Sequence, residues 1–132
     1  VPGASAVFPG GWVTYSDAAK QCLLGVAAST LAEHGAVSPQ TACEMAAGAR
    51  ARLGTDFGVA VTGIAGPAGG SDAKPVGTVF IGLATVEGTN ARKHFNPVDR
   101  ETFKWVTSQQ AFEMLRRAMD AGPPLSHGPR AS

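Results

Sequence analysis

Hydrophobic and polar residues follow one another along the chain in patterns that predict both helices and strands. The clearest helix begins after Ser38, a good N-cap residue, has Pro39 at its first position and ends before Gly54. Between these limits apolar residues recur at spacings of three and four, and most of them are alanines. A face of such small side chains predicts close contact with a neighbouring layer, which we expect to be a sheet.

Three other segments carry helical signals. Ser16 is a candidate N-cap for a helix over residues 17–24, and residues 29–33 predict a further short turn. A long helix is expected from residue 99 to about residue 120, because apolar residues recur along one face. The residues expected on this inner face are Phe103, Val106, Gln110, Ala111, Met114, Leu115 and Ala118.

Four segments have the composition of strands. Residues 11–15 are rich in β-formers, and residues 57–62 are nearly all apolar, a pattern typical of a central strand covered on both faces. Residues 78–86 predict the next strand, and a hairpin turn at residues 88–90 leads to a polar edge strand over residues 91–95.

Helix groups on either side of these strands predict an α/β fold, a three-layer α/β/α sandwich with a mixed central sheet. One domain is expected over residues 1–121, followed by a disordered tail over residues 122–132.

The composition narrows the function classes. Hydrophobic residues make up 44% of the chain and charged residues 16%, so there is enough apolar material for a core. The net charge of +1, without any basic run, argues against a nucleic-acid binder. We expect no signal peptide or membrane span, and no cofactor or metal. Cys22 and Cys43 lack partners at zinc-ligand spacing and are interpreted as reduced thiols.

The glycine-rich loop over residues 63–77 is the first candidate for chemistry. It follows a predicted strand and contains Gly63, Gly66, Gly69 and Gly70, whose flexibility lets successive N–H groups form an anion cradle. It matches neither the P-loop nor the dinucleotide fingerprint. Its position at a strand end favours a substrate-binding loop, and a mobile structural loop is the alternative.

Two further positions are candidates. Tyr15 closes a predicted strand and Lys20 lies one turn into the next helix, so both side chains could act at the same sheet end as base and activator. The alternative is a solvated lysine beside a core tyrosine. Arg100 opposes the dipole of the last helix, and a phosphate or carboxylate ligand would offset this, as would Asp99 or Glu101.

Five stretches of the sequence carry a family resemblance. Residues 61–71 (VTGIAGPAGGS) and 74–79 (KPVGTV) resemble the signature of the CinA C-terminal domain family of competence/damage-inducible proteins. Residues 11–20 (GWVTYSDAAK), 23–26 (LLGV) and 34–38 (HGAVS) match the same family in the same order.

The resemblance, which extends to about Met119, implies a cytoplasmic bacterial enzyme. Stand-alone members of the family hydrolyse the carboxamide of nicotinamide mononucleotide, without a metal, to nicotinic acid mononucleotide and ammonia. The resemblance implies that Tyr15 and Lys20 are the activating pair and Thr62 the active-site threonine. The substrate-binding residues that it implies are Gly63, Ala65, Gly66, Gly69, Gly70 and Arg100.

The resemblance begins only after one motif of the family. Family members carry, upstream of the matching region, a serine-containing motif that ends in Thr-Gly-Gly, and that serine is the expected nucleophile. The match therefore implies a chain truncated at its N-terminus, without the family's first strand and helix.

A missing central strand leaves an apolar edge uncovered, so we expect a homo-oligomer. Its other expected partner is a small-molecule nucleotide, with no nucleic acid and no membrane. The alternative function is a catalytically inactive nucleotide-binding or assembly module.

Overall fold

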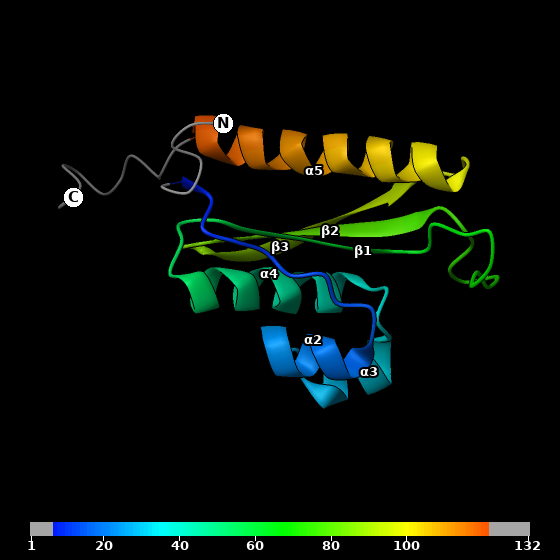
Figure 1. The fold of residues 1–132 in the computed structure, drawn as a ribbon, viewed down its shortest axis with the longest axis horizontal. Helices are drawn as coiled ribbons and strands as arrows, with labels where there is room; N and C mark the ends of the chain where they lie inside the picture. The colour runs from blue at the N-terminus through cyan, green and yellow to red at the C-terminus, as the bar shows by residue number, and fades with distance from the viewer. Residues whose placement is uncertain (1–6, 122–132) are drawn as a thin grey trace, which may run out of the picture.

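The computed structural model describes residues 7–121. Its elements in chain order are α2 (Asp17–Leu24), α3 (Ala28–His34), α4 (Pro39–Leu53), β1 (Gly58–Gly63), β2 (Thr78–Thr85), β3 (Gly88–Phe95) and α5 (Arg100–Ala121). The three strands form a sheet with α5 on one face and α4 on the other, while α2 and α3 lie on the far side of α4 (Figure 1). This arrangement confirms the α/β class and the layer order.

Both strand pairings of this sheet are antiparallel, in the order β1-β2-β3. The mixed sheet that we expected is therefore not what the described residues form. The reason lies in the connections, because no helix crosses over between consecutive strands. The chain returns directly after β1 and again after β2.

The turn between β2 and β3 lies two residues earlier than predicted. Thr85 pairs with Gly88, so Val86 and Glu87 form the turn and residues 88–90 already belong to β3. Gly88 has a φ of +135°, which gives this glycine a role at the start of the strand. The edge position and polar character predicted for β3 are confirmed, since most of its residues are exposed.

β1 is not the central strand that its apolar sequence predicted. Among the described residues it pairs only with β2, so it forms one edge of the sheet, and Val61 is 40% exposed. β2 takes the central place and is buried along nearly its whole length. A run of apolar residues shows that a strand is buried, but it does not reveal the order of the strands.

The strand predicted over residues 11–15 is absent. This segment is extended but pairs with no described strand, and a strand without a partner lacks the backbone hydrogen bonds that define it. One of its β-forming residues, Trp12, instead packs its side chain against the core between the sheet and α4.

The helix predictions hold well. The Ser38 hydroxyl accepts a hydrogen bond from the Thr41 amide at 3.1 Å, and Gly54 ends α4 at a φ of +62°. The turn predicted at residues 29–33 is instead a full helix, α3. Glu44 of α4 explains this difference, because its carboxylate accepts from the Ala27 amide and the Thr30 hydroxyl at the start of α3. A cap that comes from another helix leaves no signal in the sequence of the helix that it caps.

The long C-terminal helix was predicted almost to the residue. Phe103, Ala111 and Met114 are buried as expected, and Thr107 joins them. The tail predicted for residues 122–132 lies outside the described residues. No helix of the described part of the chain is long and apolar enough to cross a membrane.

Candidate functional site

The candidate residues gather at the end of the sheet where β1 finishes. The loop over residues 64–77 leaves β1 there and returns to β2. The start of α2, the turn between α3 and α4 and the start of α5 lie at the same end of the molecule (Figure 1). Hydrogen bonds join the loop to two of these three segments, the turn between α3 and α4 and the start of α5.

Backbone hydrogen bonds close this loop at its neck. The Ile64 amide donates to the Thr78 carbonyl at 2.8 Å, and the Gly77 amide donates to the Ile64 carbonyl at 2.7 Å. At the tip, the Ser71 amide donates to the Lys74 carbonyl at 2.9 Å, which forms a tight turn. These backbone hydrogen bonds therefore fix both ends of the loop and its tip.

The glycines of the loop fulfil the conformational role predicted for them. Gly66 and Gly69 have φ values of +78° and +99°. A Cβ atom at Gly66 would lie 2.5 Å from Val76 Cγ1, so the loop leaves no room for a side chain there. Among the described residues, the amides of Ala65, Gly66, Gly69 and Gly70 have no hydrogen-bond acceptor. Gly69 and Gly70 are exposed and Ala65 is half-buried, so their N–H groups are donors available to a ligand, whereas Gly66 is buried.

Thr62, the residue before the loop, has its hydroxyl proton committed. Its side chain is 6% exposed and donates to the Ala36 carbonyl at 2.6 Å. Because a hydroxyl has a single proton, Thr62 Oγ1 can only accept a hydrogen bond from a further group. Gly63 follows directly, where a Cβ atom would lie 2.8 Å from Val79 Cγ2.

The structure separates the two members of the predicted activating pair. Lys20 is buried, at 7% exposure, and its Nζ donates to the Thr14 carbonyl at 2.9 Å. Tyr15 is 90% exposed and forms no hydrogen bond with Lys20 in the described residues. In this arrangement Lys20 has two further protons to donate, while the tyrosine ring faces solvent.

Two basic side chains hold the loop from opposite sides. Arg100 donates to the Gly66 carbonyl at 2.9 Å, and Lys74 donates to the His34 carbonyl at 2.7 Å. Lys74 was not among the predicted site residues, although it stands in the stretch that carried the resemblance. Its place in that motif was the signal that could have found it.

The site end of the sheet carries cations without matching carboxylates. Within the described residues, Lys20, Lys74 and Arg100 form no salt bridge and donate instead to backbone carbonyls. Of the two carboxylates beside Arg100 in sequence, Glu101 pairs with Lys104, and Asp99 accepts from the Thr102 hydroxyl and amide, which lower the pKa of Asp99. The remaining donors of the three cations are available to an anion.

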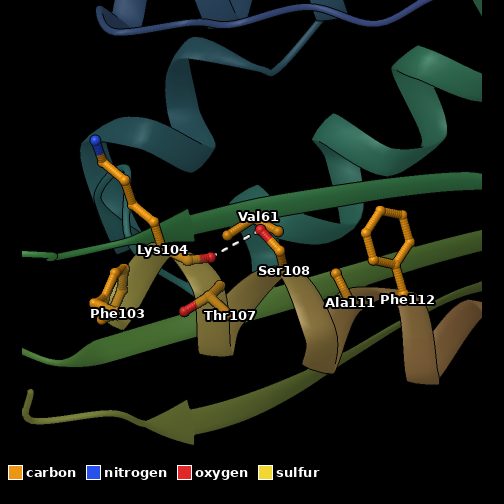
Figure 2. A pocket seen from close by; sticks show the side chains of 7 residues that line it. All are labelled: Val61, Phe103, Lys104, Thr107, Ser108, Ala111 and Phe112. Carbon is orange, nitrogen blue, oxygen red and sulfur yellow. Dashed lines mark hydrogen bonds between the residues drawn. The ribbon is translucent and has the colours of Figure 1, made fainter. Parts of the chain in front are cut away.

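An apolar groove of about 310 Å³ lies elsewhere, between β1 and α5 (Figure 2). It is lined by Val61, Phe103, Lys104, Thr107, Ser108, Ala111 and Phe112. Its one titratable group is that of Lys104, so no carboxylate or imidazole lines this groove to act as a general acid or base beside the lysine. The described residues also contain no cluster of three His, Cys, Asp or Glu side chains arranged to hold a metal ion.

Comparison with known proteins identifies the family. The model of the CinA C-terminal domain matches residues 1–119. The chain belongs to this family. It is 54% identical over 124 residues to a CinA-like protein of Syntrophus aciditrophicus and 53% identical over 121 residues to one of Geotalea daltonii. Each match covers 92% of this chain and 29% of the relative, so the chain spans under a third of their length.

Solved structures of the family share the fold. The competence/damage inducible protein CihA from Agrobacterium tumefaciens superposes with a TM-score of 0.75 at 45% identity, over 81% of this chain and 66% of that one. The competence damage-inducible protein A from Klebsiella pneumoniae gives a TM-score of 0.79 at 37% identity, over 84% and 69%. The resemblance read from the loop motif is thus confirmed at the level of the family.

Proposed function

We propose that this CinA domain binds a pyridine mononucleotide at the loop end of the sheet and takes part in hydrolysis of its carboxamide. The observation that carries the proposal is the set of donors around the loop. Free amides of Ala65, Gly69 and Gly70 lie on a loop held by Arg100 and Lys74, neither of which has a carboxylate partner in the described residues. Such a surface suits a phosphate or a developing oxyanion.

The reaction requires a nucleophile, which in the family is the serine of the upstream motif. Its hydroxyl oxygen attacks the carboxamide carbon, while the Lys20 ammonium gives a proton to the departing nitrogen and takes up the serine proton in its place. Ammonia leaves, and the acyl group remains on the serine as an ester. Water then cleaves the ester to the acid and restores the serine. In this scheme Thr62 Oγ1 accepts a hydrogen bond from the carboxamide N–H, because the hydroxyl already donates its one hydrogen bond to the Ala36 carbonyl. The loop amides stabilise the oxyanion or the phosphate.

The second candidate function is a nucleotide-binding or assembly module without catalysis. Two observations favour it: the ring of Tyr15 faces solvent, and Lys20 donates to the Thr14 carbonyl. An activating pair in this arrangement does not act on a common substrate atom.

Ammonia release from nicotinamide mononucleotide separates the two functions. We expect the 132-residue chain to bind the mononucleotide without releasing ammonia, and turnover to begin when a segment carrying the family's serine motif is added, fused or as a peptide. In that active form, Lys20→Ala reduces the rate by about 10²–10⁴, the usual contribution of a general base. Lys93→Ala on the exposed strand β3 is the matched control. Binding without turnover in every form supports the module instead, and full activity of the bare chain would refute the serine nucleophile.

The homo-oligomer belongs to the same proposal. The outer edge of β1 has no strand partner in the described residues, and unpaired edges attract further strands. Light scattering on the 132-residue chain gives the mass directly. A monomer at all concentrations would remove oligomer formation from the proposal.

A further inference from the structure

The turn between α3 and α4 presents three consecutive carbonyl groups, and each is held by a side chain from a different element. The His34 carbonyl accepts from Lys74 of the loop at 2.7 Å. The Gly35 carbonyl accepts from Thr41 of α4 at 2.7 Å and from Ser38 at 3.1 Å. The Ala36 carbonyl accepts from Thr62 of β1 at 2.6 Å. These side-chain hydrogen bonds fix the position of the turn relative to the glycine-rich loop, α4 and β1.

The turn therefore joins two features of the candidate site. Through its Ala36 carbonyl it sets the direction of the Thr62 hydroxyl, and through its His34 carbonyl it holds the tip of the glycine-rich loop. The Lys74 backbone closes the tip turn with Ser71, so its side chain acts on the part of the loop farthest from the neck. Shifting the turn would move both features together.

Gly35 is adapted to this contact. It has a φ of +79°, and a Cβ atom there would lie 3.3 Å from Lys74 Nζ. That distance is shorter than an ordinary van der Waals contact, so a Cβ atom at this position would displace the ammonium group by a few tenths of an ångström. The absence of a side chain at Gly35 leaves room for Lys74 beside the carbonyl that it binds.

The geometry points to Lys74 as a positioning residue: by clamping the loop to the turn His34, Gly35 and Ala36, it holds the loop amides and the Thr62 hydroxyl in one arrangement for the ligand. This inference rests on the proposed function for the identity of the ligand, nicotinamide mononucleotide. It assigns Lys74 a role through hydrogen-bond geometry, distinct from simple attraction of an anion by its charge.

A first experiment measures the loop without ligand. In Lys74→Met, hydrogen exchange at the amide of Ser71 should become at least about tenfold faster, because the tip is released, while the Gly77 amide at the neck serves as an internal reference. Lys74→Arg, which can still donate to the His34 carbonyl, should keep most of the protection. Lys93→Met, on the exposed strand β3, is the matched control and should change nothing. Unchanged exchange in Lys74→Met would overturn the inference.

A second experiment measures affinity for nicotinamide mononucleotide by calorimetric titration. Lys74→Met and Gly35→Ala should each weaken binding by about tenfold, and the double variant should lose little more, because both remove the same contact. Gly35→Ala keeps the positive charge, so it tests position alone. Gly88→Ala, at a φ of +135° in open space, controls for the strain of adding a Cβ atom at a positive φ outside the left-handed helical region, where Gly35 also lies.

The outcomes separate the inference from the proposed function. If Gly35→Ala binds like the parent while Lys74→Met binds weakly only at low salt, Lys74 acts through its charge and the inference is wrong. If both variants lower the melting temperature but leave affinity unchanged, Lys74 merely caps α3 and the inference is equally wrong. If the parent shows no affinity, the proposed function fails, and hydrogen exchange alone decides whether the clamp exists.

Discussion

On the α4 face of the sheet, glycines bring backbone against backbone, whereas on the α5 face side chains keep the helix at a distance. A Cβ atom at Gly82 of β2 would overlap the Ala42 carbonyl oxygen, and one at Gly58 of β1 would overlap that of Ala46. The α5 face is filled by larger residues such as Phe103, and it keeps an open groove beside β1 (Figure 2).

This difference shows where the packing tolerates the least change in side-chain size. At Gly58 and Gly82 the α4 face has no room for an added carbon, so α4 is held tightly against β1 and β2, whereas a hollow of about 410 Å³ remains between α4 and the edge strand β3. Thr62 of β1 is in turn hydrogen-bonded to the turn before α4. The α5 face adapts more easily, because side chains with several rotamers meet there and part of the interface is open. The candidate site depends on the tightly packed side.

The largest effect is expected from adding one carbon on the α4 face. Gly82→Ala should lower the free energy of unfolding by about 3 kcal/mol, at the upper end of overpacking costs, because neither β2 nor the α4 backbone can move aside. Urea unfolding measures this. Gly11→Ala, whose Cβ atom meets Phe8 only at 3.8 Å, should have little effect. A stable Gly82→Ala variant would show that the two layers can separate.

The same substitution on both faces sharpens the comparison. Ala46→Val, at a position with 0% exposure on the α4 face, should cost about 1–3 kcal/mol. Ala111→Val, on the rim of the groove, should cost under about 1 kcal/mol, which is the propensity penalty of a β-branched residue in a helix. Equal costs in thermal unfolding would contradict the difference in packing.

A smaller effect is expected at the anchored start of α4. Thr41→Val removes one of the two hydroxyl donors to the Gly35 carbonyl at a fully buried position. The Ser38 hydroxyl remains, so the loss should be about 1 kcal/mol. Thr41→Ser, which keeps the hydroxyl, should recover most of the stability in the same measurement. Full stability of Thr41→Val would show that Ser38 alone satisfies this carbonyl.

The smallest effect concerns the exposed start of α5. Hydrogen bonds from Thr102 lower the pKa of Asp99, so its charged form contributes stability at pH values above the ordinary carboxyl pKa of about 4. That contribution is lost as the pH falls through the lowered pKa. Asp99→Asn has no charge to lose, so its melting temperature should lie slightly below that of the parent at pH 6 and approach it at pH 3. A constant difference across this range would exclude the carboxylate as the cause.

Local signals explain how much of the fold could be predicted. The limits of α4 follow from Ser38, Pro39 and Gly54, whose effects on the backbone need no distant partner. Its alanine face predicted close packing for the same reason, since side-chain size is a property of the sequence. The resemblance in the loop motif likewise identified the family, because a long glycine pattern at a strand end is specific.

The rest depended on contacts between distant segments. Residues 11–15 have the composition of a strand but no described partner, and β1 has the composition of a central strand but an edge position. Pairing order depends on which strands meet, and composition does not record this. The exposed Tyr15 ring and the Glu44 cap on α3 were missed on the same grounds.

By itself, the sequence determined the limits of α4, the small-residue face, the glycine-rich loop and the family, because caps, side-chain volumes and backbone freedom act within a few residues. Only the tertiary structure decided that Lys74 donates a hydrogen bond to the His34 carbonyl and that the Thr62 hydroxyl donates one to the Ala36 carbonyl. These contacts join residues 40 and 26 positions apart, and their geometry exists only once the layers have packed.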